Sequence, residues 1–327
     1  MGYNSTGRET FASFEGYWHD ASLNLDWSSV FVLPPWLRVW WQVFGEGNEL
    51  YLRSFRDDKG LLGLAPLRIK DKTAYLVGSA DVCDYLDFIT VPGQESLFYD
   101  ALLSELEKDG IGRLELESLR PETSAIHYLA AIARERGFRV ATTRENVSLE
   151  MALPETWGEY LTTLTPKQRH EARRKLRRLN EAGQVNYKCE ENPPEINLAM
   201  DTFLRLFGLS RAEKASFMTP AKETFFRSIA DETAKNGILR LGTLEFDGEA
   251  AAMIMAFDYD DTVYLYNSGY DPRFENLSVG IASKLLCIKE AVARGKQKWD
   301  FLKGGEQYKY HLGGHEVPVY RCQIIKT

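Results

Sequence analysis

The sequence predicts an α/β fold with mixed sheets, organised as two tandem domains that arose by internal duplication. The chain has 327 residues, roughly twice a usual domain length of about 150. Short apolar strands alternate with longer helical segments, which indicates sheets with helices packed on their faces. The same order of elements occurs twice, about 188 residues apart.

The repeat is read from pairs of matching segments. In each half, two strands are followed by a helix and then by a short, buried strand. The pairs are 60–69 with 248–257, 73–81 with 262–271, 95–109 with 278–294, and 113–117 with 298–302. Both helices end at a glycine, Gly110 or Gly295, which suits a left-handed C-cap. This agreement favours duplication over coincidence.

The second half can be written out as a complete domain. Asp247-Gly248 is a strong hairpin dipeptide between two strands. The expected strands are 184–190, 238–246, 249–257, 262–267, 297–302 and 317–325, with helices near 197–207, 221–236, 278–294 and 306–312. We therefore expect a first domain over residues 1–153, a basic linker helix region over 154–183, and a second domain over 184–327.

Composition excludes several classes of protein. A hydrophobic content of 44% excludes a disordered chain, and a net charge of -7 argues against a general nucleic-acid binder. No apolar run approaches the roughly 18–20 residues of a membrane span, and the N-terminus lacks a signal-peptide pattern. The four cysteines are far apart, and glycines separate His311 from His315, so neither set has metal-ligand spacing. We expect a cytoplasmic protein without a metal.

A basic helix is the clearest local feature. Thr165 provides an N-cap, Pro166 fits the first turn, and Gln168 completes a capping box. Seven of the twelve residues from 167 to 178 are Lys or Arg. One interpretation is a solvated helix docked by a narrow apolar edge. The other is that Arg169, Arg173 or Arg177 binds an anion, which is a carboxylate, a phosphate or the backbone of a tRNA.

The last sixty residues carry a recognisable pattern: Tyr264-Leu-Tyr-Asn-Ser-Gly-Tyr-Asp271, Ser278-Val-Gly-Ile-Ala282, Trp299-Asp-Phe-Leu-Lys-Gly-Gly305 and Tyr308-Lys309. This pattern and the order of elements resemble the GCN5-related N-acetyltransferase (GNAT) fold. The chain is similar to the CelD-like acetyltransferase branch, which is related to the Fem-type aminoacyltransferases of peptidoglycan synthesis. Both groups carry two GNAT units, so the resemblance covers nearly the whole chain. It implies an N-acyltransferase that uses acyl-CoA as co-substrate.

The expected donor site is the start of the helix at 278. A helix N-terminus offers unpaired N–H groups and the positive end of the helix dipole, which suit a pyrophosphate. Cofactor binding is therefore expected at Ser278, Val279, Gly280, Ile281 and Ala282. The GNAT pattern begins with Gln or Arg, whereas this chain has Leu277 there. The alternative is an ordinary capped helix. The first half has no equivalent loop, so we expect the first domain to form one wall of the cleft that binds the acceptor.

Acyl transfer to an amine needs a base and a proton donor for the leaving thiolate. Asp300 or Glu306 is the expected base, and Tyr308 the expected acid. Lys309 is expected to contact a donor phosphate or an acidic acceptor, and in the Fem relatives the matching lysine contacts substrate. Lys303 lies in the same segment and is a substrate-binding candidate. The alternative is that Asp300 caps the chain or pairs with nearby basic residues, and that Tyr308 and Lys309 only line the surface.

The preceding strand offers further substrate-binding candidates. Tyr264, Tyr266 and Tyr270 occupy alternating positions near its end, so one face can present phenols to a cleft. Tyr266, Ser268 and Tyr270 are the substrate-binding candidates, although ordinary packing explains alternating aromatics equally well.

Three functions follow from these features. The leading hypothesis is direct transfer of an acyl group from acyl-CoA to an amine of a small molecule or cell-envelope precursor. The second is a Fem-like transferase that uses aminoacyl-tRNA to form an amide. The third is a non-catalytic binding protein on a GNAT scaffold.

Overall fold

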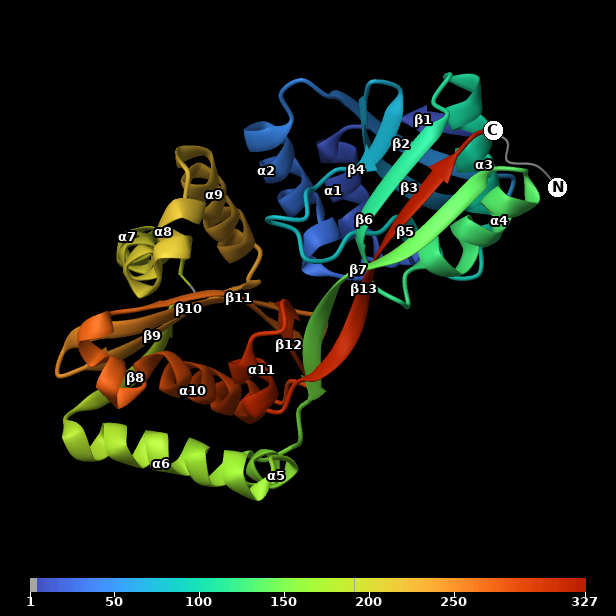
Figure 1. Cartoon of the computed structure of the whole chain (residues 1–327). Helices are drawn as coiled ribbons and strands as arrows, with labels where there is room; N and C mark the ends of the chain where they lie inside the picture. Colours follow the sequence, from blue (N-terminus) through green and yellow to red (C-terminus); the bar gives the residue numbers. More distant parts are fainter. Residues whose placement is uncertain (1–4, 191) are drawn as a thin grey trace. The chain divides into compact units, whose positions relative to one another are not determined.

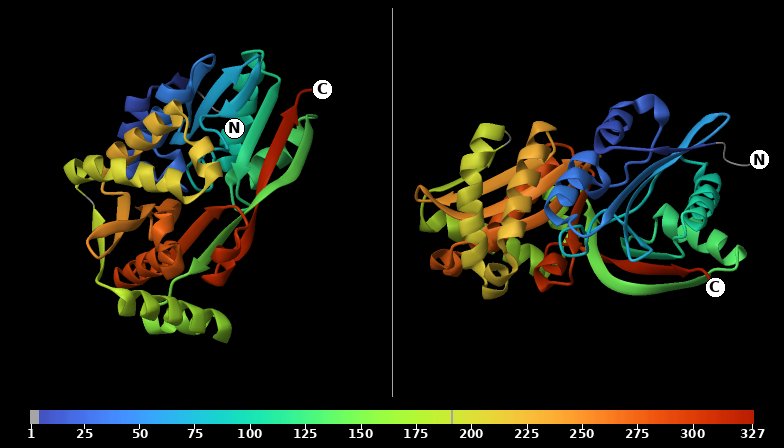
Figure 2. Two further views of the ribbon diagram at one scale, coloured as in Figure 1. Left: turned by 60° about the vertical axis from the view of Figure 1, so that its left-hand side comes forward. Right: turned by 90° about the horizontal axis from the view of Figure 1, so that it is seen from above.

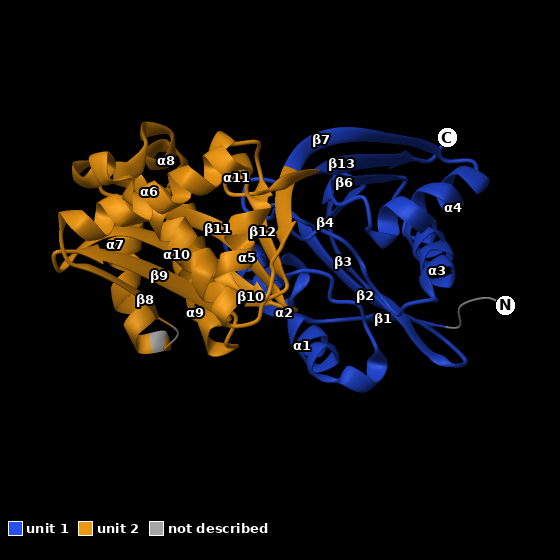
Figure 3. Cartoon of the chain, turned by 90° about the horizontal axis from the view of Figure 1, so that it is seen from below, with its two compact units in different colours: residues 1–147, 317–327 blue, residues 148–316 orange. Residues whose placement is uncertain are grey.

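The computed structural model describes residues 5–190 and 192–327. These residues form two compact units, which are coloured separately in Figure 3. Unit 1 contains residues 1–147 and 317–327, and unit 2 contains residues 148–316. The chain thus leaves unit 1, builds unit 2 and returns to unit 1 with its last eleven residues.

Unit 1 is a mixed sheet with helices. Its strands lie in the order β1-β2-β3-β4-β6-β13, and β5 pairs with β3. The strands are β1 (Ser5–Arg8), β2 (Glu49–Asp57), β3 (Gly60–Lys70), β4 (Thr73–Leu76), β5 (Ile89–Thr90), β6 (Arg113–Leu119) and β13 (His315–Ile325). The helices are α1 (Phe11–His19), α2 (Pro34–Phe44), α3 (Glu95–Lys108) and α4 (Ala130–Glu135).

Unit 2 repeats this architecture with strand order β7-β12-β11-β10-β9-β8. The strands are β7 (Arg139–Ala152), which begins in unit 1 and enters unit 2 at Ser148, β8 (Val185–Glu190), β9 (Leu239–Phe246), β10 (Glu249–Tyr259), β11 (Thr262–Tyr270) and β12 (Lys298–Lys303). The helices are α5 (Trp157–Thr163), α6 (Pro166–Ala182), α7 (Pro193–Ser210), α8 (Ala212–Phe217), α9 (Pro220–Lys235), α10 (Val279–Ala293) and α11 (Gln307–His311). In Figure 1, α7 to α9 cover one face of this sheet, and α10 and α6 lie on the other.

The two units share one pairing pattern, which confirms the tandem repeat. In unit 1, β4 pairs in parallel with β6 across α3, from Thr73↔Arg113 to Tyr75↔Glu115. In unit 2, β11 pairs in parallel with β12 across α10, from Thr262↔Lys298 to Tyr264↔Asp300. An antiparallel hairpin precedes each of these pairs, β2–β3 in unit 1 and β9–β10 in unit 2. The expected mixed α/β fold is therefore correct.

The glycines expected at the helix ends have the required backbone. Gly110 after α3 and Gly295 after α10 both have a φ of 73°. The dipeptide Asp247-Gly248 joins β9 to β10 with φ values of 49° and 83°, as a type I′ hairpin turn requires. These conformations follow directly from the local sequence.

The unit boundaries differ from the domain limits expected from the sequence. The first expected domain ends at residue 153, whereas unit 1 gives way to unit 2 after Val147. The expected second domain includes residues 317–327, whereas the structure assigns them to unit 1. The cause is strand exchange: β13 pairs with β6, from Tyr320↔Leu119 to Ile325↔Arg113.

Candidate active site

The sheet of unit 2 opens at the end of β11. The parallel ladder between β11 and β12 ends at Tyr264 and Asp300. Beyond it, β11 continues beside β10 to Tyr270, while Lys303 of β12 pairs with Ser148 of β7. At this end β11 and β12 therefore no longer pair with each other but with β10 and β7. The donor and acceptor sites predicted from the sequence lie at this end.

A β-bulge changes which side chains of β11 share a face. The register of β11 with β10 shifts at Tyr266, so the simple alternation expected from the sequence does not hold. The Tyr266 ring packs on Phe226 of α9, with ring centroids 5.4 Å apart. Ser268 and Tyr270 instead contact α10. Tyr266 is therefore separated from the other two candidates by the strand itself.

The start of α10, the predicted donor site, has an irregular entry. A 3-10 turn, Pro272–Leu277, leads into Ser278, which has a φ of 57° and makes no side-chain capping bond. Gly280 lies under the ring of Tyr270, because a Cβ added there would be 3.1 Å from Tyr270 Cδ1. The backbone of this first turn is thus approached closely by one aromatic ring, with no side chain capping it.

Two of the five loop candidates point into the core. Val279 and Ala282 are fully buried and join a cluster with Leu179 of α6. Ser278, Gly280 and Ile281 are partly exposed. Any ligand at this helix end therefore meets the backbone of the turn and the exposed side of these three residues, while Val279 and Ala282 anchor the turn to α6.

The basic helix α6 packs beside α10, on the same face of the sheet (Figure 2). The Thr165 hydroxyl accepts from the backbone N–H of Gln168 at 3.4 Å, and Gln168 Oε1 accepts from the backbone N–H of Thr165 at 2.9 Å. The expected capping box is therefore present. Leu179 belongs to the core cluster and the partly buried Leu176 packs against it, so the helix is docked by the predicted narrow apolar edge.

The three arginines named from the sequence differ in their surroundings. Arg169 is partly buried, and its guanidinium donates to the carbonyl of Leu164 at 3.3 Å. Arg173 and Arg177 are exposed. Arg177 lies 3.8 Å from Glu181, and both of these side chains are about 70% exposed. Arg173 and Arg177 are therefore accessible to an anion, whereas Arg169 is partly engaged with the helix entry.

Asp300 stabilises an unusual backbone conformation at Leu302. Its side chain is 1% exposed, and Oδ1 accepts from the backbone N–H of Leu302 at 2.7 Å. Leu302 has a φ of 61°, which costs free energy in a branched residue and needs support from its neighbours. The carboxylate of Asp300 provides that support at the end of β12.

Lys309 holds the loop that follows. Its ammonium donates to the carbonyl oxygens of Leu302 at 3.1 Å, Lys303 at 2.6 Å and Gly304 at 3.0 Å. It also lies 2.9 Å from Glu306 Oε2, and its side chain is only 3% exposed. This geometry fixes the loop and leaves little of Lys309 accessible, whereas Glu306 is 49% exposed. Lys303 is partly exposed beside it.

Tyr308 lies between this loop and α10. Its ring stands 5.0 Å from the ammonium of Lys284 and packs edge-on against Phe301. Burial raises the pKa of the Tyr308 hydroxyl, so the phenol keeps its proton at neutral pH. A protonated phenol beside a developing thiolate is what a proton donor requires.

Two lysines at this site, the buried Lys284 and the partly buried Lys214, were not anticipated from the sequence. Lys284 of α10 donates to Ser268 Oγ and to the carbonyl of Gly280, both at 2.9 Å. Lys214 of α8 donates to the carbonyl of Ser268. The sequence did contain a hint of a special role for Lys284, since it is the only charged residue between Val279 and Ile288. The sequence contained no such hint for Lys214, because it lies in the short helix α8, which only the tertiary fold brings next to β11.

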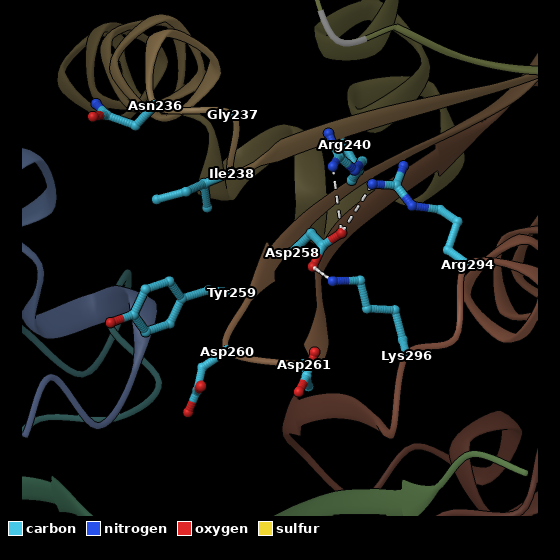
Figure 4. Close-up of a pocket in the computed structure, with 10 residues that line it drawn as sticks. All are labelled: Asn236, Gly237, Ile238, Arg240, Asp258, Tyr259, Asp260, Asp261, Arg294 and Lys296. Atoms are coloured by element: carbon cyan, nitrogen blue, oxygen red, sulfur yellow. Dashed lines mark hydrogen bonds and ion pairs between the residues drawn. The ribbon is translucent and has the colours of Figure 1, made fainter.

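A second feature of unit 2 lies at the other end of β11. A hollow of about 390 Å³ surrounds the β10–β11 turn (Figure 4). In it the Asp258 carboxylate binds Lys296 at 2.6 Å, Arg294 at 3.2 Å and Arg240 at 3.4 Å. At about 3.3 Å per strand residue, this hollow lies roughly 20 Å from Ser268. No residue predicted from the sequence lines it.

Two further surveys concern metals and membranes. Across residues 5–190 and 192–327, no three His, Cys, Asp or Glu side chains lie close enough to hold a metal ion. None of the helices in these ranges combines the length and apolarity of a membrane span.

Comparison with known proteins shows which domain family and which folds this chain is similar to. A family model described as an acetyltransferase (GNAT) domain matches residues 166–310. The solved structure of FemX is 11% identical, with 97% of each chain covered and a TM-score of 0.65. The C-terminal domain of a putative lysylphosphatidylglycerol synthetase from Agrobacterium fabrum is 10% identical, with a TM-score of 0.60 over 96% of this chain and 92% of that one.

A third structure, L-PGS from Bacillus licheniformis, is 12% identical, with a TM-score of 0.54 over 89% of this chain and 90% of that one. No curated protein sequence matches this chain significantly. At such low identities the structural likeness shows a shared fold. The region matched by the GNAT model contains the α10 turn, Lys214, Lys284, Glu306 and Tyr308.

Proposed function

We propose, on the premise that this chain belongs to the GNAT superfamily, that it transfers an acyl group directly from acyl-CoA to an amine. The observation that carries this proposal is the GNAT match over residues 166–310, which spans the whole candidate site. The acyltransferase class follows from the family. The acyl-CoA donor, the direct mechanism and the amine acceptor are the proposed part.

The start of α10 would hold the donor. Its N–H groups carry the partial positive charge of a helix N-terminus, which attracts phosphate oxygens. The absence of a side-chain cap on Ser278 and the missing side chain of Gly280 support this assignment. CoA would supply the activated thioester. The chain's own residues would orient this thioester and transfer the protons of the reaction.

The transfer would proceed in one step. The amine nitrogen attacks the thioester carbonyl, so that a C–N bond forms and the C–S bond breaks. The half-exposed carboxylate of Glu306 accepts the amine proton, and the Tyr308 hydroxyl gives its proton to the leaving sulfur. Asp300 and Lys309 hold the 302–304 loop in place, because both are buried against its backbone. They are positioning residues in this proposal.

The substrate-binding candidates fall into two groups, those near the proposed reaction and one that lies away from it. Ser268 and Tyr270 lie on the α10 side of β11, next to the donor turn, and Lys303 lies at the loop after β12. Tyr266 supports the α9 side instead. The acceptor is an amine of a small molecule or of a cell-envelope precursor. The fold shared with FemX and a lysylphosphatidylglycerol synthetase supports the second class.

Thermal unfolding with acetyl-CoA and with a long-chain acyl-CoA tests the donor. A ligand at about one hundred times its Kd adds roughly 2.7 kcal/mol of stability, which raises the melting temperature measurably. The Gly280→Tyr variant should lose this shift. Gly16→Tyr is the matched control, since Gly16 is an exposed helical glycine with open space around its Cβ position. No shift with any thioester would contradict the acyl-CoA proposal.

An aminoacyl-tRNA donor is the second candidate, and the exposed Arg173 and Arg177 of α6 favour it. A tRNA titration beside the thioester titration separates the two donors. If neither ligand binds and no donor is turned over, the third function, a non-catalytic binding protein, is the one that remains.

A further inference from the structure

Two lysine side chains, the buried Lys284 and the partly buried Lys214, meet at one serine of the candidate site. Lys284 reaches the Ser268 hydroxyl from α10, and Lys214 reaches the Ser268 carbonyl from α8. Aromatic rings cover both ammonium groups: Tyr308 lies 5.0 Å from Lys284 Nζ, and Phe207 lies 4.7 Å from Lys214 Nζ. Among residues 5–190 and 192–327, no carboxylate is bonded to either amine. The proposed reaction leaves both without a role.

The charges around these amines do not balance. The exposed Arg211, which directly precedes α8, adds a third positive charge, and Cys287 of α10 and Tyr308 of α11 keep their protons because burial raises the pKa of both. Glu306 is the acidic group that faces them, and its carboxylate is already 2.9 Å from Lys309. The site thus has a surplus of positive charge, of which the Lys284 ammonium is buried and the Lys214 ammonium partly buried.

This surplus affects how readily the amines hold their protons. Burial, and then the charge of Lys214, lowers the pKa of Lys284 to about 7. Burial, and then the charge of Arg211, lowers the pKa of Lys214 to about 8. A buried cation is stabilised by an opposite charge a few ångströms away. An anion between the two amines would therefore raise the pKa of both.

We propose that Lys214 and Lys284 form a binding site at Ser268 for an oxyanion of the substrate, a carboxylate or a phosphate group. The inference rests on the proposed transfer reaction, since it places this group beside the acyl donor turn through Gly280, whose carbonyl Lys284 also binds. The acceptor would then be an acidic amine, unless the bound group is a phosphate of the donor itself.

Anion binding at this site is coupled to proton uptake. At about pH 8 most of Lys284 and half of Lys214 are neutral, so binding takes up more than one proton. At about pH 6 both amines are already charged, and uptake is close to zero. The apparent affinity should fall about tenfold between pH 7 and pH 8, because roughly one proton is taken up on average in that range.

Isothermal titration calorimetry with sodium acetate and with inorganic phosphate measures this uptake, using buffers of different ionisation enthalpy at each pH. Wild-type protein should bind at least one of the two probes. With acetate, which stays ionised over this range, the uptake should grow from pH 6 to pH 8, and the uptake with phosphate should grow likewise once the titration of phosphate itself, near pH 7, is subtracted. Lys284→Met should reduce the uptake at pH 8 to about half a proton and weaken binding at least tenfold. Lys289→Met is the matched control, since it removes an exposed lysine from the same helix.

The results separate cleanly. Binding without proton uptake, binding that survives Lys284→Met and Lys214→Met, or no binding of either probe at pH 6 overturns the proposal. Anion binding that persists in Gly280→Tyr, while acyl-CoA binding is absent in all variants, would leave this site standing and refute the acyl-CoA donor. Saturation with CoA distinguishes the sources: a donor-phosphate site is blocked by CoA, whereas an acceptor site still binds acetate.

Discussion

The ring of Tyr270 lies against the backbone of Gly280, so that a Cβ added to Gly280 would be 3.1 Å from Tyr270 Cδ1. That spacing is slightly tighter than an ordinary contact, and the partly exposed ring can move by a few tenths of an ångström. Alanine also favours helix over glycine by up to about 1 kcal/mol. The structural effect of a methyl group here is therefore small.

Gly280→Ala consequently separates folding from donor binding. We expect the free energy of unfolding to stay within about 1 kcal/mol of wild type, because the two effects oppose each other. If donor phosphates approach this backbone, acyl-CoA affinity should fall about tenfold. Urea unfolding and a thioester titration on the same sample measure both quantities. Unchanged affinity would place the donor elsewhere.

Lys309→Met should destabilise unit 2 strongly. The substitution leaves three loop carbonyl oxygens without the ammonium that now binds them, and buried unsatisfied groups cost about 1–3 kcal/mol each. We expect a loss of about 3 kcal/mol or more in urea unfolding. Glu306→Gln is the comparison, because the half-exposed carboxylate contributes about 1 kcal/mol or less. Similar losses in both variants would refute the loop-holding role.

The elements with strong local signals were predictable from the sequence. The α6 capping box, the Asp247-Gly248 turn and the glycines after α3 and α10 depend on residues within a few positions of one another, and all four have the expected geometry. The repeat was also readable, because its strands and helices recur in the same order. These features need no knowledge of distant contacts.

The site was less predictable, for physical reasons. Tyr266 was assigned to the face of Tyr270 by alternation, and one bulge residue in β11 separates them. Lys309 carries the same positive charge whether it meets substrate or backbone carbonyls, and only the turn after β12 decides that. The pairing of β13 with β6 involves residues some 200 positions apart. No local pattern specifies contacts of that kind.

Unit 1 offers a prediction about pH. Asp87 is buried, with Oδ1 accepting from Phe88 N at 2.9 Å and Oδ2 from Ser124 N at 3.1 Å. Burial raises its pKa to about 7, well above the value near 3.9 of an unfolded chain. The folded state therefore holds a proton that the unfolded state has lost, so this group makes stability fall as the pH rises from about 4 to 7.

Asp87→Asn removes this dependence, because the amide does not titrate. Between pH 5 and pH 8, wild type should lose about 2 kcal/mol more stability than the variant, measured by urea unfolding at both values. A constant difference caused by the amide itself cancels in this comparison. Parallel pH profiles for the two proteins would show that Asp87 titrates normally.

The exposed face of α6 gives a test of the tRNA alternative. Arg173, Arg177 and Arg178 are exposed, whereas Arg174 is held by two hydrogen bonds to Glu171. If α6 binds the phosphate backbone of tRNA, replacing the three exposed arginines with alanine should weaken binding and lower the salt slope by about 2. Filter binding over a range of salt concentrations measures this slope.

The control for that experiment removes the same charge from unit 1. Lys59, Lys70 and Lys72 are exposed, and their combined replacement by alanine should leave the tRNA salt slope unchanged. Equal effects of the two triple variants would indicate that tRNA responds to net charge alone. No measurable tRNA binding by wild type would remove this donor from consideration.

The contact between β11 and α7 supports a final prediction. A Cβ added at Gly269 would lie 2.3 Å from the backbone nitrogen of Phe207 and 2.4 Å from the carbonyl carbon of Leu206. Both are main-chain atoms of α7, so no rotamer change can relieve the overlap. Gly269→Ala should therefore destabilise the protein by about 3 kcal/mol, within the range of severe overpacking. It should also displace Ser268 and weaken oxyanion binding by the adjacent lysines.

Gly208→Ala in α7 is the control: its Cβ position is open, and the substitution should stabilise the helix by up to about 1 kcal/mol. Urea unfolding of both variants measures these opposite signs, and a neutral Gly269→Ala would mean that α7 does not approach β11 this closely.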